Sequence, residues 1–291
     1  MPGATNSAPA RRVSGLILFR NSCVIKQIIC INWGTKYGAP YVNRLYAMVA
    51  RNITPPFTFT CFTDNREGIH PAVLCEDLPS IDYEIPETRR GIWPKSRLWG
   101  EKLGSLSGTV LFLDLDLVIT GSLDRFFAFG NPEDVILSRN AAKPFERLGQ
   151  TSVYRFPVGK LVPIQKKFAA NPLAVAEEYG YEQRFVTREA PGGIKFFPRK
   201  WIRHFRFQCL LPFPLNLFFP ARLPAETSIV IFPGEVLPSD AITGGWSGRQ
   251  GITLWQHLKA FADYGFRRKR PFQFLRHFML PVKWVEDHWR E

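Results

Sequence analysis

The chain has 291 residues, of which 45% are hydrophobic and 22% are charged. This composition, with 25 Phe, 8 Trp and 8 Tyr, excludes a disordered chain, a collagen and a coiled coil. The formal net charge is +13, and residues 151–291 hold 21 basic and 11 acidic side chains. We therefore expect the second half to meet an anionic partner: nucleic acid, the phosphates of a nucleotide or an acidic membrane surface.

The N-terminal stretch and the cysteines indicate where in the cell the protein is expected. The five cysteines are odd in number and show no C-x-x-C spacing, which favours a reduced, cytoplasmic compartment. The apolar stretch from Val13 to Ile31 is interrupted by Arg20 and Lys26, so it predicts no membrane-spanning helix. Residues 1–25 are expected to form an N-terminal extension that is partly disordered.

From Lys26 onward, short apolar runs alternate with segments of helical spacing. The expected elements are strands at 28–31, 57–62 and 109–113, and helices through 41–49 and 97–107. Strands that alternate with helices indicate a mostly parallel sheet covered on both faces. The expected fold class is therefore α/β.

The second half contains a segment of a different kind. Residues 195–223 mix basic and aromatic side chains with several prolines and no acidic residue, which predicts irregular structure. A late strand is expected at 229–232, and a helical tail from Leu254 carries the basic run Arg267–Arg270. The basic aromatic segment suits nucleic acid, an anionic bilayer, or a core strand pair with a solvated basic face. Membrane contact or a phosphorylated glycolipid acceptor is our preferred interpretation, and nucleic acid is disfavoured.

The motif with the clearest chemical meaning is Asp114-x-Asp116, directly after the apolar strand at 109–113. Strand residues two apart project from the same side, so the two carboxylates can share one cation. Mn²⁺ or Mg²⁺ takes oxygen ligands and typically couples one or two carboxylates to a substrate's phosphates. The alternative is that the aspartates only begin a surface turn. The apolar strand before them favours a metal site.

The segment around these aspartates resembles a known family. Leu111-Phe-Leu-Asp-Leu-Asp-Leu-Val-Ile-Thr-Gly-Ser-Leu-Asp124 is similar to the metal-binding segment of nucleotide-sugar glycosyltransferases with the GT-A fold. It resembles in particular the family-8-like group, which includes glycogenin and galactosyltransferases of bacterial lipopolysaccharide. The resemblance covers roughly 26–240 and is strongest at 97–124. It implies a Rossmann-like, mostly parallel sheet flanked by helices, in a transferase domain at 26–255 before a basic amphipathic tail at 256–291.

The same resemblance implies site residues and cofactors. Asp114 and Asp116 would bind a Mn²⁺ or Mg²⁺ ion that bridges the donor's diphosphate, and Arg97 would offset phosphate charge as the nucleotide leaves. Glu182 and Gln183 would lie near the reacting sugar, with an exposed helix end as the alternative. The residues expected to hold the base and ribose follow the first two strands, where turn capping is the alternative for Asn32 and Asp64: Asn32, Trp33, Tyr37 and Asp64.

One departure from the family pattern concerns the third metal ligand. The family closes its site with a His-x-x-Gly-x-x-Lys-Pro segment, and the matching stretch here keeps Gly234 and Pro238 without the His and the Lys. Asp240, His257 or water are candidates to complete the metal's coordination. Arg249 is the candidate to replace the lysine.

The sequence therefore predicts a hexosyltransferase-like enzyme of the EC 2.4 class. A nucleotide-diphosphate sugar, with a UDP-sugar favoured, would donate its sugar to the hydroxyl of a glycolipid or polysaccharide precursor, as in lipopolysaccharide synthesis. The resemblance favours retention of configuration, whereas an inverting enzyme would need a carboxylate base, for which Glu182 is the candidate. We expect a cytoplasmic enzyme, peripheral on the inner face of the cell membrane. The alternative is a catalytically inactive transferase-like scaffold that binds an anionic membrane or nucleic acid.

Overall fold

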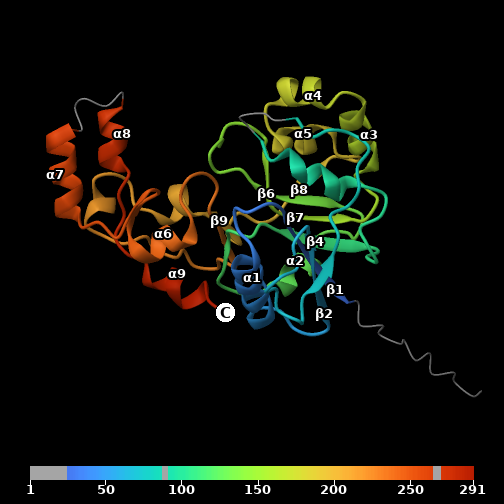
Figure 1. Cartoon of the computed structure of the whole chain (residues 1–291), viewed down its shortest axis with the longest axis horizontal. Helices are drawn as coiled ribbons and strands as arrows, with labels where there is room; N and C mark the ends of the chain where they lie inside the picture. Colours follow the sequence, from blue (N-terminus) through green and yellow to red (C-terminus); the bar gives the residue numbers. More distant parts are fainter. Residues whose placement is uncertain (1–24, 87–90, 265–269) are drawn as a thin grey trace, which may run out of the picture.

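The computed structural model describes residues 25–86, 91–264 and 270–291. At its centre is a seven-stranded sheet of order β3-β2-β1-β4-β7-β6-β8 (Figure 1). Only β7 runs antiparallel to both of its neighbours, and the remaining pairs are parallel. The strands are β1 Lys26–Asn32, β2 Phe57–Thr63, β3 Leu74–Glu76, β4 Thr109–Leu113, β6 Val135–Arg139, β7 Gly149–Pro157 and β8 Ile194–Phe196. The predicted mostly parallel sheet is confirmed, and residues 1–24 of the extension expected at 1–25 lie outside the described residues.

Helices cover both faces of this sheet because its strands are apolar on both sides. Ile28 and Cys30 of β1 belong to one buried cluster, and the intervening Ile29 and Ile31 belong to another. The first cluster is completed by α1 and the second by η1 and α3–α5. The helices are α1 Ala39–Arg51, the 3₁₀ helix η1 Trp93–Trp99, α2 Asp124–Ala128, α3 Val162–Ala170, α4 Pro172–Tyr179 and α5 Glu182–Glu189. This arrangement confirms the predicted α/β class.

The helix predicted at 97–107 is wrong. A 3₁₀ helix ends at Trp99 instead, and the chain then turns toward the sheet edge. Gly104 has a φ of +53°, which glycine adopts readily and other residues rarely do. Glu76 of β3 accepts hydrogen bonds from the backbone nitrogen and the hydroxyl of Ser105, at 3.1 and 2.9 Å. These tertiary contacts outweigh the helical spacing of the segment.

The C-terminal third begins with the predicted irregular segment. A small second sheet contains β5 Val118–Ile119, β9 Ile202–His204 and β10 Ile229–Ile231, the last of which confirms the predicted late strand. The π turn η2 Phe205–Cys209 and the 3₁₀ helix η3 Leu215–Leu217 lie between β9 and β10. The later elements are α6 Pro238–Thr243, β11 Gly245–Trp246, β12 Arg249–Gln250, α7 Leu254–Tyr264, α8 Pro271–Arg276 and α9 Lys283–His288.

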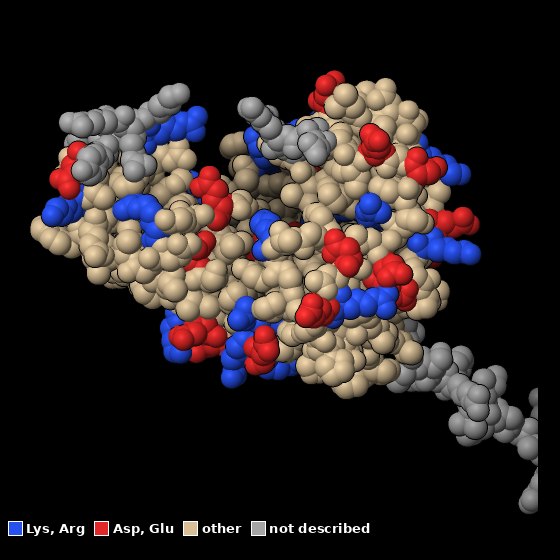
Figure 2. Space-filling model, in the orientation of Figure 1, with Lys and Arg blue, Asp and Glu red and all other residues tan. Residues whose placement is uncertain are grey.

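The predicted tail at 256–291 holds most of α7 and all of α8 and α9. Helices α7 and α8 stand apart from the central sheet, and α9 returns beside α1 (Figure 1). Val285 and Trp289 pack into the same buried cluster as α1. The surface is hollowed between the part that carries α7 and α8 and the part that carries α3–α5 (Figure 2). Of the predicted basic run, residues 267–269 lie outside the described residues.

Arg155 of β7 is a buried cation that joins this strand to the end of α2. Its guanidinium donates to the carbonyls of Phe126, Phe127 and Asn131 at 2.9, 3.1 and 2.6 Å. We expect Arg155→Met to lower the free energy of unfolding by about 2–4 kcal/mol, because these carbonyls lose their donors. Urea denaturation measures the change, with the exposed Arg188→Met as the matched control. Equal urea midpoints of unfolding for Arg155→Met and Arg188→Met would contradict this stabilising role of Arg155.

Candidate active site

A cavity of about 380 Å³ lies at the carboxyl ends of β1 and β4. Its walls come from the loop after β1, the start of η1, the turn after β4, the beginning of β7 and the beginning of α5. Open α/β sheets bind their ligands at this edge. The residues that carry polar or aromatic groups into the cavity include Trp33, Lys36, Tyr37, Lys95, Asp114, Asp116, Gln150, Glu182 and Gln183.

Asp114 and Asp116 face this cavity together, as their spacing predicts. The Lys95 ammonium lies 2.6 Å from Oδ1 of Asp114, and the lysine side chain is only 4% exposed. The Tyr37 hydroxyl donates to Oδ2 of Asp116 at 2.7 Å. Leu115 between them is buried, so the aspartates do not belong to a solvated surface turn.

Negative charge exceeds positive charge around Asp114 and Asp116. Burial, followed by the charge of Asp114, raises the pKa of Asp116 to about 6. Burial, followed by the charge of Asp116, also raises the pKa of Tyr37. One buried ammonium, that of Lys95, faces the two carboxylates. A further cation beside Asp116 would relieve this imbalance.

The donor set suits a divalent ion shared between protein and substrate. Two carboxylates that face one cavity are the oxygen ligands that Mn²⁺ or Mg²⁺ prefers. In the described part of the chain, no group of three or more His, Cys, Asp or Glu side chains is arranged so that it could hold a metal ion. The remaining ligands would therefore come from phosphate oxygens and water.

The raised pKa of Asp116 predicts a pH-dependent stability. Asp116 binds its proton more tightly in the folded protein than in the unfolded chain. Its contribution to the free energy of unfolding is therefore complete below about pH 4 and is lost as the pH rises through 6. We expect metal-free Asp116→Asn to be about 1–3 kcal/mol more stable than the parent at pH 7 and equally stable at pH 4. Urea unfolding in EDTA at the two pH values measures this. An Asn variant that is less stable at pH 7 would refute it.

Trp33 lines the cavity, whereas Asn32 and Asp64 support the loop beside it. The Asn32 side-chain nitrogen donates to the Thr63 hydroxyl at 3.3 Å. The Asp64 carboxylate accepts from the backbone nitrogen of Gly34 at 2.9 Å. These contacts are those of turn-stabilising residues, and the predicted contacts of Asn32 and Asp64 with a nucleotide stay predictions.

Glu182 and Gln183 begin α5 and line the cavity. Glu182 is 1% exposed, so it does not form an exposed helix end. Its two carboxylate oxygens accept from the Ile92 backbone nitrogen at 2.7 Å and from the Thr151 hydroxyl at 2.9 Å. The Gln183 side-chain oxygen accepts from the Asn140 amide at 3.1 Å. Glu182 thus ties η1 and β7 to the start of α5.

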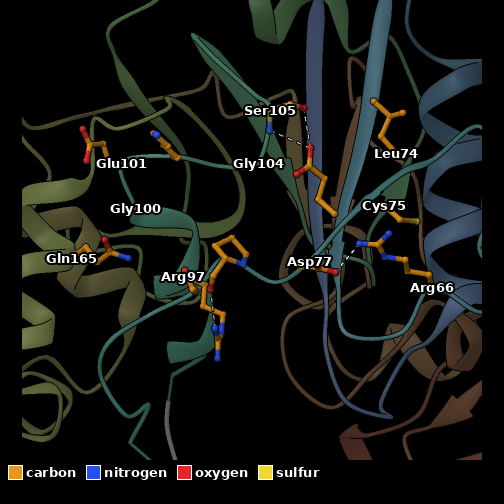
Figure 3. A pocket seen from close by; sticks show the side chains of 14 residues that line it. Arg66, Leu74, Cys75, Asp77, Arg97, Gly100, Glu101, Gly104, Ser105 and Gln165 are labelled. Carbon is orange, nitrogen blue, oxygen red and sulfur yellow. Dashed lines mark hydrogen bonds and ion pairs between the residues drawn. The ribbon is translucent and has the colours of Figure 1, made fainter.

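Arg97 points away from the two aspartates. Its guanidinium donates to the Pro79 carbonyl at 2.8 Å and lines a separate hollow of about 900 Å³ beside β3 (Figure 3). A 3₁₀ helix has three residues per turn, so side chains two apart point to different sides. Lys95 consequently faces Asp114, and Arg97 does not. The predicted role of Arg97 at the donor's phosphates has no support in this placement.

The candidates for a third metal ligand lie elsewhere. Asp240 accepts from the Leu237 backbone nitrogen at 2.8 Å and from the Gln250 amide at 2.6 Å, at the start of α6. His257 contacts the Arg249 guanidinium at 3.2 Å and the Leu275 carbonyl oxygen at 3.0 Å. None of Asp240, His257 and Arg249 lines the cavity, whereas Pro233 and Gly234 do.

Comparisons with known proteins identify the fold. No protein-family model and no curated protein matches the sequence. Among solved structures, the galactosyltransferase LgtC in complex with donor and acceptor sugar analogs matches at 14% identity and a TM-score of 0.50, over 89% of this chain and 99% of that chain. The bifunctional glycosyltransferase WbbM matches at 11% and 0.52, over 87% and 51%. The glycosyltransferase GlyE of Streptococcus pneumoniae TIGR4 matches at 12% and 0.51, over 74% and 56%.

This chain has the GT-A fold. The fold predicted from the segment 111–124 is therefore confirmed, while the family-8-like assignment stays a prediction. Within this GT-A fold, sequence reasoning identified Asp114 and Asp116 and missed Lys95. The helix expected from residue 97 onward did not include Lys95. No local sequence signal indicated that Lys95 faces the aspartates and that Arg97 points away from them.

Proposed function

We propose that this protein transfers a sugar from a nucleotide-diphosphate sugar, with UDP-sugars as the first candidates, to an acceptor hydroxyl. The observation that carries the proposal is the carboxylate pair Asp114 and Asp116, which faces a cavity at the carboxyl end of β4 in a GT-A fold. Asp114 and Asp116 would hold a Mn²⁺ or Mg²⁺ ion, which would supply positive charge to stabilise the diphosphate of the leaving nucleotide. The LgtC complex with donor and acceptor sugar analogs supports the same class of reaction.

The chain's own residues contribute binding and electrostatics. Lys95 places a buried positive charge beside Asp114, where it offsets the charge of a diphosphate more strongly than an exposed lysine does. Tyr37 holds the Asp116 carboxylate through its hydroxyl. Trp33 offers an aromatic face in the cavity wall for the base.

Glu182 and Gln183 take different parts in this proposal. Both oxygens of Glu182 accept hydrogen bonds from the protein, so this carboxylate positions the cavity wall instead of deprotonating an acceptor. Gln183 is next to it in the same wall and contacts the transferred sugar. Among the described residues that line the cavity, the carboxylates are Asp114, Asp116 and Glu182, and none of them is left to act as a base in this proposal, which supports retention of configuration.

Turnover of a donor panel tests the proposal. The protein is incubated with UDP-, GDP-, ADP- and TDP-sugars, with Mn²⁺, with Mg²⁺ or with EDTA, and the released nucleoside diphosphate is measured. We expect one donor to be consumed, only with a divalent ion, and the sugar product to keep its anomeric configuration by proton NMR. Consumption that is unaffected by EDTA would contradict the metal assignment. Inverted product would contradict the role given to Glu182.

We also propose that the enzyme works at an anionic membrane surface on a glycolipid or polysaccharide precursor. In the described residues, no helix is both long and apolar enough to cross a bilayer. Asn216 of η3 donates to the carbonyls of Arg276 and Phe278, which joins η3 to the end of α8. This part of the molecule exposes large apolar side chains by 40–77%: Phe213, Leu215, Phe218, Phe219, Trp255 and Phe272. Basic side chains accompany them, and the Arg276 guanidinium lies 5.8 Å from the centre of the Phe213 ring.

Vesicle flotation tests this surface. We expect phosphatidylglycerol vesicles to bind the protein, phosphatidylcholine vesicles to bind it little, and added salt to weaken the complex. The double variant Phe218→Ser/Phe219→Ser should bind at least roughly tenfold more weakly, because two apolar anchors are lost. The control Phe145→Ser/Leu173→Ser removes exposed apolar side chains from other elements. Equal loss in both variants would contradict the assignment, and preferential binding of RNA would favour the nucleic-acid alternative.

A further inference from the structure

The cavity of about 380 Å³ that Asp114 and Asp116 face is called the donor cavity below. A second cavity, of about 160 Å³, opens beside it at the ends of β6 and β8. Because β7 is antiparallel to both β4 and β6, and β8 is parallel to β6, the carboxyl ends of β4, β6 and β8 lie at one edge of the sheet. Neighbouring strands are about 4.8 Å apart, so β6 lies about 10 Å from β4. A ligand that extends along this edge from Asp114 therefore reaches the second cavity.

The two cavities share a wall. Ser138 lines the second cavity and donates to the carbonyl of Gln150, which lines the donor cavity, at 2.9 Å. Asn140 also lines the second cavity and donates to Gln183 of the donor cavity at 3.1 Å. The wall of the second cavity is consequently joined to Gln183 by a direct hydrogen bond.

The chemistry of the second cavity favours an anion on a sugar. Arg139 and Arg199 line it together with no acidic residue, and within the described ranges neither arginine forms an ion pair. A guanidinium matches the oxygens of phosphate and carboxylate with paired hydrogen bonds. The half-exposed Phe207 supplies apolar surface in the same lining, on which the carbon face of a sugar ring can pack.

We infer that the second cavity binds a phosphate or carboxylate group of the acceptor saccharide while an acceptor hydroxyl reaches the donor cavity. This inference rests on the proposed transferase function and narrows its acceptor to anionic saccharides. Arg139 and Arg199 select the charged group, and the shared wall of Ser138 and Asn140 sets its distance from the transferred sugar.

Binding of simple probes tests the inference. Glucose 6-phosphate, glucuronate, glucose and inorganic phosphate are compared by competition in saturation-transfer NMR, on protein saturated with UDP and Mn²⁺ so that the donor cavity is filled. We expect both charged sugars to bind the parent protein and to bind Arg139→Gln/Arg199→Gln more weakly, by at least roughly tenfold per arginine. The control Lys200→Gln removes a neighbouring positive charge that pairs with Glu226 outside both cavities, and it should bind like the parent.

The outcomes separate this inference from the function on which it rests. Equal binding of glucose and glucose 6-phosphate, equal loss in Lys200→Gln, or displacement by inorganic phosphate as strong as that by glucose 6-phosphate would overturn the acceptor site. UDP binding in the same samples reports on the donor cavity independently. One outcome overturns this inference alone: UDP binds only with Mn²⁺, and the charged sugars bind equally well to the parent and to Arg139→Gln/Arg199→Gln. If the charged sugars need the two arginines in a protein that binds none of UDP, GDP, ADP and TDP in parallel samples, the transferase function is overturned and an anion site is left.

Discussion

Replacement of Asp114 or Asp116 by Asn is expected to lower the rate of sugar transfer by at least about 100-fold, while the protein stays folded. Asparagine keeps the size and one oxygen of the side chain but loses the charge that attracts a divalent ion. The two carboxylates face the same cavity from one turn, so each single change should have nearly the full effect.

The rate of donor consumption measures this effect, with the donor identified in the panel experiment. Asp77→Asn is the matched control, because that exposed carboxylate pairs with Arg66 at the rim of the separate hollow beside β3. It should leave the rate within about twofold of the parent. An Asp116→Asn enzyme with the parent's rate would show that the reaction does not use this carboxylate pair.

Lys95→Met should lower the free energy of unfolding of the metal-free protein by about 3–5 kcal/mol at pH 7. The lysine is buried 2.6 Å from Asp114, and its loss leaves two carboxylates without the buried ammonium that faces them. Mn²⁺ should recover much of the lost stability, because the ion compensates the same charges. Sugar transfer should still fall by at least about 100-fold, since the diphosphate then lacks the buried positive charge of Lys95.

Urea unfolding of Lys95→Met in EDTA and in Mn²⁺ separates a charge effect from a packing effect. The exposed Lys102→Met lies outside the donor cavity and should be unchanged in both conditions. If Lys95→Met loses the same stability with and without Mn²⁺, the ion does not act on the carboxylates that Lys95 faces.

The sequence predicted the sheet well because the relevant information is local. Continuous burial along β1 requires cover on both faces, and the apolar runs that form β1, β2 and β4 are short and bounded by turn residues. The failed helix at 97–107 shows the limit of this reasoning. Its path depends on Glu76, which is remote in sequence and holds Ser105.

The candidate site was predictable to the same extent. The spacing of Asp114 and Asp116 predicted that both side chains face one site, and they do so from the turn that follows the end of β4 at Leu113. Which of Lys95 and Arg97 faces them depends on a 3₁₀ helix that the sequence pattern did not indicate. Asp240 and His257 were chosen by proximity in sequence to Gly234, yet their hydrogen bonds tie together the C-terminal elements.

The central claim is that Asp114 and Asp116 bind a nucleoside diphosphate together with a divalent ion. Thermal unfolding of the purified protein with UDP, GDP, ADP and TDP, each with and without Mn²⁺, tests it without knowledge of the acceptor. A ligand at 100 times its Kd adds about 2.7 kcal/mol of stability, so one nucleotide should raise the Tm by several degrees only when Mn²⁺ is present. The shift should vanish in Asp116→Asn. A nucleotide shift that persists without Mn²⁺ or in Asp116→Asn, or no shift with any nucleotide, would contradict the claim.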